Sequence, residues 1–210
     1  LPLFHVFAMT VVQNFGLRLG AELILLPRFE LAQVMDVIEK QKPTVFPGVP
    51  TIYTALNSAA EKGGHDLSSI QICISGGAPL PADVRTRFEK LTGCRLVEGY
   101  GLTEASPVVT CNPVDGVVKA GSIGLALPET VISIRTPVTC AEEMPVGEKG
   151  EVCVRGPQVM RGYWKRPGET AEQFRDGWLR TGDIGYRDAD GYIFLVDRIK
   201  DIIICGGYNV

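Results

Sequence analysis

The feature that most constrains the fold is a regular alternation, between residues 21 and 100, of short apolar runs with segments of helical periodicity. The apolar runs predict four strands, at residues 21–26, 44–46, 70–75 and 96–97. Helices are predicted between them: one from Leu31 that Pro43 ends, one over residues 50–60, and one that Gly93 closes. Strand–helix–strand repeats of this length predict an α/β fold with a mostly parallel sheet covered by helices.

The pattern changes after residue 120, where short apolar runs are separated by glycine, proline and aspartate. This texture predicts an antiparallel β-rich subdomain, with strands at residues 131–135, 151–155, 184–186 and 192–196. We therefore expect three parts: an α/β subdomain over residues 1–119, a β-rich subdomain over residues 120–197, and a hinge over residues 198–210 that leads into a further domain.

The charge balance and the cysteines exclude several classes of protein. The chain has 21 Lys and Arg against 24 Asp and Glu, so no basic excess points to nucleic acid or to an anionic membrane surface. No apolar stretch approaches the roughly 18 residues of a spanning helix. The six cysteines form no CxxC pair, so neither a zinc site nor a redox dithiol is expected. Scattered thiols are typical of a cytoplasmic protein.

The residues that follow the strand at 96–97 carry the strongest local signal. Ligands of α/β folds bind beyond the carboxyl ends of the strands. Tyr100 offers an aromatic face for a base, and Gly101 allows a close backbone approach. Thr103 offers a hydroxyl for a phosphate, and Glu104 offers a carboxylate for Mg²⁺. An ordinary strand-to-loop exit explains the same residues equally well.

The turn at residues 75–80 follows the preceding strand and is rich in small residues, which leave space for a planar ligand against the backbone. A tight strand–helix turn is the alternative. The serine of this turn does not form a hydrolase nucleophile elbow, because Cys73 stands where that motif requires glycine. Gly99 and Gly101 are not a dinucleotide fingerprint, because Glu104 replaces the third glycine.

Two further motifs carry charge at strand boundaries. Asp183, after a glycine, can accept two hydrogen bonds from a ribose diol, although a turn aspartate is the alternative. Arg198, in a charged stretch, supplies fixed donors for a sugar or a phosphate, although a solvated linker is the alternative. Residues 188–191 lack the glutamate of a calcium loop and predict a hairpin turn between Tyr186 and Tyr192.

The order and spacing of these motifs are more specific than any one of them. SGGAPLP, EGYGLTEASP, GSIG, GEVCVRGPQVMRGYW, GWLRTGDIG and DRIKDIII follow one another along nearly the whole chain. This series resembles the adenylate-forming superfamily, which includes acyl-CoA synthetases, luciferases and the adenylation domains of peptide synthetases. The segments LVEGYGLTEASPVV and GPQVMRGYWKRP are most similar to bacterial long-chain fatty-acid–CoA ligases.

The resemblance implies a two-step reaction. A carboxylate attacks the α-phosphate of ATP and releases pyrophosphate, and the thiol of coenzyme A then attacks the acyl carbon of the mixed anhydride. Such chemistry needs positioning and charge stabilisation, with Mg²⁺ as cofactor, rather than a protein nucleophile. The implied partners are therefore ATP, coenzyme A and a fatty acid, with no nucleic acid.

The resemblance also implies contacts with the base and the sugar. One side of the adenine would meet Gly77, Ala78 and Pro79. The other side would meet Glu98, Gly99 and Tyr100, with the Tyr100 ring stacked on the base. The ribose would be held by Asp183 and Arg198, and Leu195 would pack near the adenine.

Further roles follow from the same matching. Thr103 would contact the α-phosphate and Glu104 would hold Mg²⁺. Lys200 matches the hinge about which the small C-terminal domain of the family rotates. The remaining matches are Gly206 and Gly207 near the pantetheine arm of coenzyme A, and His5, Val49 and Gly101 in the lining of the acyl tunnel.

Two expected parts of the family pattern are missing from these residues. The phosphate loop with its lysine would precede residue 1, and the domain with the catalytic lysine would follow Val210. We therefore expect a piece of a larger adenylate-forming fold, with weak nucleotide affinity and without adenylation at a useful rate. Robust ATP–pyrophosphate exchange by these residues alone would contradict that expectation.

Two other functions stay open at this point. One is an adenylating enzyme for an aryl or amino acid, although no aspartate near His5 or Val49 matches an ammonium-binding group. The other is a non-catalytic nucleotide-binding module. The resemblance allows monomers and homodimers, and it leaves open a peripheral membrane contact of a long-chain enzyme.

Overall fold

The computed structural model describes residues 1–137 and 139–198, and the backbone of residues 204–205 and 208–209. The chain divides into two compact units, Leu1–Glu98 and Gly99–Val210. The division falls within one strand, β2 (Arg95–Gly101). Each unit is described by itself below.

The first unit begins with a helical segment that the periodicity did not predict. It consists of α1 (Val6–Ala8), a π-helical turn η1 (Met9–Asn14) and α2 (Phe15–Leu19). The segment ends at Gly20, whose positive φ of 68° suits glycine. The strand predicted at residues 21–26 is wrong: these residues have no strand conformation, and the Leu25 side chain is 57% exposed. An apolar run becomes a strand only where a second strand completes its hydrogen bonds, and no described strand pairs with this run.

The three predicted helices of the first unit and the strands predicted at residues 70–75 and 96–97 are confirmed. The helices are α3 (Leu31–Gln41), α4 (Pro50–Ala60) and α5 (Ala82–Thr92). Strand β1 (Ile72–Ser75) pairs in parallel with the first half of β2, in a register that places Ser75 opposite Glu98. The strand predicted at residues 44–46 does not form as a strand: Val45 makes one isolated parallel bridge to Ile72 of β1, and Gly48, beyond the predicted segment, makes another to Ser75.

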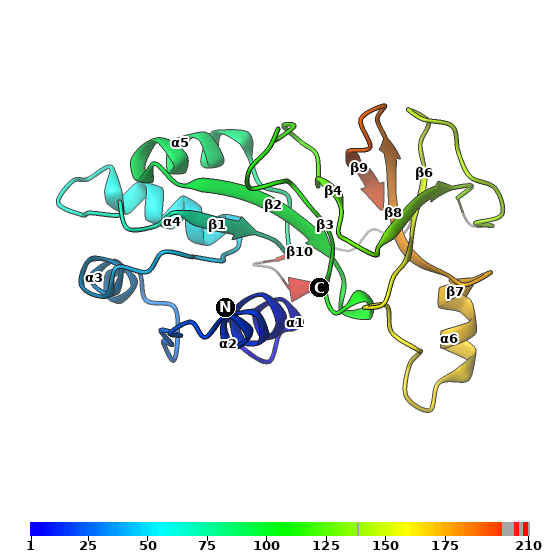
Figure 1. The fold of residues 1–210 in the computed structure, drawn as a ribbon, viewed down its shortest axis with the longest axis horizontal. Helices are drawn as coiled ribbons and strands as arrows, with labels where there is room; N and C mark the ends of the chain where they lie inside the picture. Colours follow the sequence, from blue (N-terminus) through cyan, green and yellow to red (C-terminus); the bar gives the residue numbers. More distant parts are fainter. Residues whose placement is uncertain (138, 199–203, 206–207, 210) are drawn as a thin grey trace. The chain divides into compact units, whose positions relative to one another are not determined.

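A single core joins these helices and strands. Figure 1 shows α4 and α5 beside β1 and β2. Tyr53 of α4 lies at the centre, with an edge-to-face contact to Phe88 of α5 at a centroid distance of 5.0 Å. The Tyr53 hydroxyl donates to the carbonyl of Ile74 in β1. This core therefore fixes the carboxyl end of β1, from which the turn at residues 75–80 leaves.

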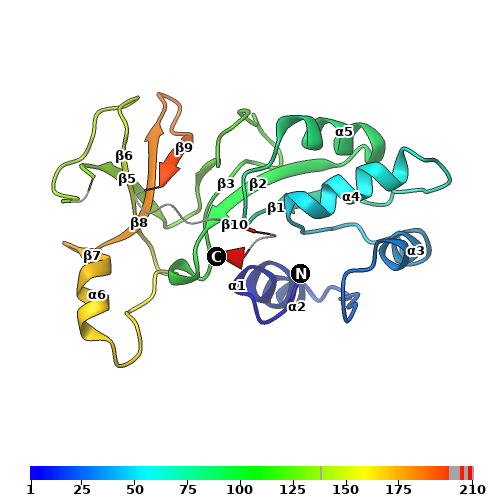
Figure 2. The same ribbon diagram turned by 180° about the vertical axis from the view of Figure 1, so that it is seen from behind.

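The second unit is the β-rich region. The end of β2 pairs antiparallel with β3 (Val108–Cys111), which pairs with β4 (Leu125–Ala126). A further antiparallel sheet has the order β5-β6-β8-β7, with β9 on β8, and Figure 2 shows β5, β6, β8 and β9 side by side. Its members are β5 (Val131–Arg135), β6 (Gly150–Arg155), β7 (Phe174–Arg175), β8 (Trp178–Arg187) and β9 (Ile193–Arg198).

The short elements of this unit complete the description. A 3-10 turn, η2 (Thr103–Ala105), follows β2, and α6 (Pro167–Gln173) precedes β7. Two short strands, β10 (Ile204–Cys205) and β11 (Tyr208–Asn209), pair with each other. The antiparallel texture predicted for this region is thus confirmed, with β8 longer than the predicted strand at 184–186.

The hairpin turn predicted at residues 188–191 is also confirmed. The Asp188 carboxylate accepts the backbone N–H groups of Asp190 and Tyr192, and Gly191 takes a positive φ of 88°. Lys119 donates to the carboxylates of Asp188 and Asp190. The aspartates therefore close a turn between β8 and β9.

The structure also describes the surroundings of the cysteines and the lengths of the helices. Four cysteines, at positions 73, 94, 140 and 153, are buried, and burial raises the pKa of the Cys153 thiol. They pack as small apolar side chains. Within the described part of the chain, no helix has the length and apolar character needed to cross a membrane.

Candidate functional site

The turn between β1 and α5 contacts β2 at Glu98, because the two strands are parallel neighbours and Ser75 lies opposite Glu98. The Leu80 N–H donates to Glu98 Oε1 at 3.2 Å, so one carboxyl ties the turn to β2. Gly77 takes a positive φ of 79° and is exposed. A Cβ atom at Gly77 would lie 3.7 Å from Val49 Cγ1. The structure thus brings together four of the predicted residues of the first unit, namely Gly77, Ala78, Glu98 and Val49, at the carboxyl edge of its strands.

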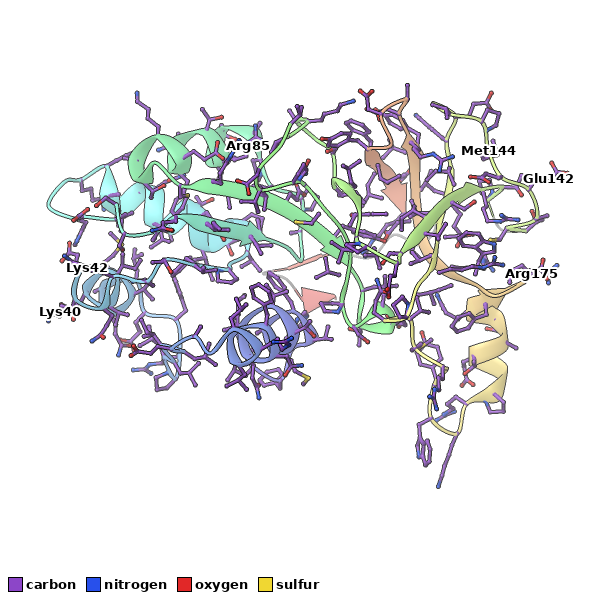
Figure 3. The ribbon with its side chains drawn as sticks, viewed as in Figure 1. Lys40, Lys42, Arg85, Glu142, Met144 and Arg175 are labelled. Atoms are coloured by element: carbon purple, nitrogen blue, oxygen red, sulfur yellow. The ribbon has the colours of Figure 1, made fainter. Side chains whose placement is uncertain are left out.

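The Glu98 carboxyl is held in an unusual electrostatic environment. Burial raises its pKa from 4.5 to about 7, against the opposing effects of the Leu80 N–H and the charge of Arg85. Arg85 lies on α5 (Figure 3), one turn before Glu89, to which its Nε lies 3.9 Å away. The turn is therefore anchored by a carboxyl that gains and loses its proton near neutral pH.

In the second unit, three residues predicted to bind the nucleotide contact one another. Asp183 and Arg198 are opposite each other in the β8–β9 ladder, and Arg198 Nε donates to Asp183 Oδ1 at 2.6 Å. The Tyr100 hydroxyl, from the end of β2, donates to Asp183 Oδ2. Burial and the Asp183 charge raise the pKa of Tyr100 well above its usual value, so the hydroxyl stays protonated. Asp183 is only 5% exposed.

A buried carboxylate that the sequence reasoning missed supports this group. Glu151 of β6 is 1% exposed, and its Oε2 accepts from Arg180 Nη2 at 3.0 Å. Its Oε1 accepts the Gly182 N–H at 3.3 Å, one residue before Asp183. Thr181 donates to the carbonyl of Val152 and accepts the Asp183 N–H. The available signal was a glutamate inside an apolar strand, which requires a buried partner.

The predicted phosphate-binding residues lie on η2, and Gly101 positions this turn. A Cβ atom at Gly101 would lie 1.7 Å from the carbonyl oxygen of Pro107, so only glycine allows the chain to double back here. Ala105 is fully buried, whereas the Thr103 side chain is exposed and Glu104 is half-buried. The hydroxyl and the carboxylate therefore project from a turn that is anchored on its other side.

Tyr163 is a second residue that the sequence reasoning missed. Its hydroxyl donates to Glu104 Oε1 at 2.8 Å. Burial and this hydrogen bond raise the pKa of Tyr163 to about 12, which keeps the donor protonated at neutral pH. The Glu104 carboxylate is thus held from the segment that leads into α6.

The remaining predicted residues have simpler surroundings. Leu195 of β9 packs at the edge of the second unit's core, as does Tyr100. His5 caps α1, with its Nδ1 accepting the Phe7 N–H at 3.2 Å, so the proton of the neutral ring lies on Nε2. Pro79 is exposed in its turn, and Gly99 pairs with Cys111. Lys200, Gly206 and Gly207, predicted as hinge and coenzyme A contacts, lie outside the described residues.

The donor set fits a magnesium ion brought by a nucleotide. Among the described residues, no group of three or more His, Cys, Asp or Glu side chains could hold a metal by itself. Mg²⁺ in nucleotide enzymes is commonly bound by one or two carboxylates, with phosphate and water oxygens as the other ligands. Glu104, a half-buried carboxylate next to the exposed Thr103, is of the type that would supply such a single hard ligand.

A family profile described as "AMP-binding enzyme" matches residues 1–164. The chain belongs to the AMP-binding enzyme family. A long-chain-fatty-acid–CoA ligase of Bacillus subtilis is 52% identical over 209 residues, which are 100% of this chain and 37% of that protein. A feruloyl-CoA synthase of Amycolatopsis is 42% identical over 210 residues, or 100% of this chain and 42% of that protein.

A solved structure agrees with this membership. ATP-bound MatB from Rhodopseudomonas palustris superimposes with a TM-score of 0.86 at 37% sequence identity, over 100% of this chain and 41% of that one. The chain therefore spans less than half the length of these relatives. The AMP-binding enzyme family is adenylate-forming, and the sequence motifs had predicted this membership.

Proposed function

We propose that this chain carries the sugar and phosphate contacts of an acid–thiol ligase that activates a fatty acid with ATP and transfers it to coenzyme A. The observation that carries the proposal is the contact among Tyr100, Asp183 and Arg198 in a chain of this family. The Asp183 carboxylate is buried and already accepts two hydrogen bonds, so a bound ribose hydroxyl could replace one of these donors without reorienting the carboxylate.

The proposed chemistry assigns each residue a role without a covalent enzyme intermediate. Asp183 accepts the ribose hydroxyl groups, and Arg198 donates to the same sugar. Thr103 donates to the α-phosphate while the acid's carboxylate oxygen attacks phosphorus and pyrophosphate leaves. The coenzyme A thiol then attacks the acyl carbon, which yields the thioester, AMP and a proton. When bound at Glu104, Mg²⁺ supplies neutralising charge for the phosphates.

In the first unit, we propose that residues 77–79 and Glu98 contact the adenine, and that His5 and Val49 line the path of the acid. In the second unit, we propose that Gly101 lines the acyl tunnel. The close approach of its backbone to Pro107 is by itself a sufficient reason for a glycine at this position. The roles of Leu195, Lys200, Gly206 and Gly207 stay predictions, as does the division at residues 119 and 197.

The nature of the acid is the finer part of the proposal. The 52% identical relative is a fatty-acid ligase, which favours a long acyl chain, whereas the 42% identical feruloyl-CoA synthase supports an aryl acid as the second candidate. A panel of palmitate, ferulate, benzoate and an amino acid, tested in the full-length gene product by ATP–pyrophosphate exchange, separates them. Palmitate is expected to give the highest exchange, and a higher rate with ferulate would select the second candidate.

The site itself is tested by Asp183→Asn. Removing this charge is expected to weaken AMP binding by about 10- to 100-fold, because hydrogen bonds to a charged acceptor are the stronger ones. Asp188→Asn is the matched control, because Asp188 closes the β8–β9 hairpin turn. Calorimetry with AMP measures both. Equal affinities for the two variants would remove Asp183 from the nucleotide site.

A further inference from the structure

The segment between β6 and α6 is docked on Glu104 at two points. The Met160 N–H donates to the backbone carbonyl of Glu104 at 2.7 Å. Three residues later, the Tyr163 hydroxyl donates to the Glu104 side chain at 2.8 Å. The two contacts fix both the backbone position of Glu104 and the direction of its carboxylate.

The docked segment is itself fixed by α6. The Tyr163 N–H donates to Thr170 Oγ1 at 2.9 Å, and the Thr170 hydroxyl donates to the carbonyl of Arg166 at 2.8 Å. Gly162, with a φ of 149°, lets the two segments approach, because a Cβ atom there would lie 2.6 Å from Thr170 Cγ2. A continuous set of hydrogen bonds therefore runs from the first turn of α6 to Glu104.

We propose that Tyr163 is a positioning residue that orients the Glu104 carboxylate toward the divalent cation of the bound nucleotide. This inference rests on the proposed function. The Tyr163 hydroxyl bonds Oε1, which leaves Oε2 as the oxygen for the cation and restricts rotation of the carboxyl group. Outer partners of this kind change metal affinity without contacting the metal.

A purely structural role for Tyr163 makes a different prediction. If the hydroxyl only held the segment between β6 and α6 in place, its loss would lower stability and would change nucleotide affinity with and without metal alike. If Tyr163 positions Glu104, its loss lowers the affinity for the cation and leaves the affinity for the metal-free nucleotide unchanged.

The test uses Tyr163→Phe in the full-length gene product, with Tyr186→Phe as the matched control. Tyr186 lies on β8, and its ring stacks on Phe194 at a centroid distance of 4.9 Å. Mn²⁺ is the probe, and its affinity is measured by electron paramagnetic resonance with α,β-methylene-ATP bound. We expect Tyr163→Phe to weaken Mn²⁺ binding about tenfold. Calorimetry with AMP in the absence of metal is expected to give the wild-type affinity, and the control is expected to retain both.

A double-mutant cycle with Glu104→Gln decides whether Tyr163 acts through this carboxylate. In the Glu104→Gln background, Tyr163→Phe is expected to have no further effect on Mn²⁺ affinity. Wild-type Mn²⁺ affinity in the single variant, or a full additional loss in the double variant, would overturn the inference. Failure of the proposed function has another signature: no acid in the panel supports pyrophosphate exchange, whatever Mn²⁺ binding shows.

Discussion

The turn after β1 and the central part of strand β8 hold candidate ligand-binding residues by opposite means. Residues 76–79 have small or cyclic side chains, and the link from this turn to β2 is a backbone N–H on the Glu98 carboxyl. Residues 180–183 lie within β8, where its register with β6 shifts, and they are held by Glu151, a fully buried carboxylate, and by the ion pair between Asp183 and Arg198.

The difference shows two ways to build a binding surface. Small residues leave the backbone accessible to a flat ligand and require little of the rest of the fold. A buried charge requires partners that are already in place, because burying an unpaired charge costs about 3–5 kcal/mol of folding free energy. The turn after β1 is therefore expected to tolerate substitution, and the central part of β8 is expected not to.

The largest expected effect contrasts Gly101→Ala, at a close backbone approach, with Gly77→Ala, in the open turn after β1. A methyl group at Gly101 would overlap the Pro107 carbonyl, so we expect a loss of about 3 kcal/mol or more in the free energy of unfolding. At Gly77 there is space, and only the positive φ opposes the change, at a cost of about 1 kcal/mol. Urea denaturation compares the two variants, and equal losses would mean that close approach is not what requires Gly101.

Glu151→Ala tests the buried carboxylate. The change removes the partner of Arg180 and the acceptor of the Gly182 N–H, so we expect a loss of about 3 kcal/mol in the free energy of unfolding. Glu142→Ala is the control, because Glu142 lies exposed in the loop between β5 and β6 (Figure 3). Matching urea midpoints for the two variants would show that the buried carboxylate does not stabilise this part of β8.

Glu98 gives the first unit a pH dependence of its own. Its proton leaves near pH 7 in the folded chain and near 4.5 in the unfolded chain, so the folded state binds more protons between these values. Stability contributed by the protonated form is therefore lost as the pH rises through this window, by about 2 kcal/mol. Glu98→Gln should remove this component. Denaturation at pH 5 and pH 7.5 measures it, and an unchanged pH dependence in the variant would contradict the assignment.

Lys119→Gln should have the smallest effect. Lys119 pairs with Asp188 and Asp190 at the hairpin turn, where water screens the charges, in contrast to the pair of Glu151 with Arg180. The expected change in Tm is about 1 °C or less. Differential scanning calorimetry measures the Tm of this variant and of Glu151→Ala, and equal Tm shifts would mean that burial does not distinguish the two ion pairs.

The sequence by itself determined the local elements and the candidate turns. The periodicity of residues 31–41, the glycine at position 93 and the short apolar runs of β5 and β6 between turn residues are local signals, and each predicted its element. Asp183 and Arg198 were candidates because their side chains suit a ribose diol, as acceptor and as donor, and the resemblance to the adenylate-forming superfamily assigned both to the sugar.

Only the tertiary structure decided which side chains support these candidates. Tyr163 and Glu104 are 59 positions apart, and Glu151 and Arg180 are 29 apart, so no local pattern links them. The same reason explains residues 21–26, whose apolar run predicted a strand that has no partner among the described strands. Secondary structure follows from periodicity along a few residues, whereas the pairing of buried polar groups depends on register between distant segments, which the packing of the whole unit sets.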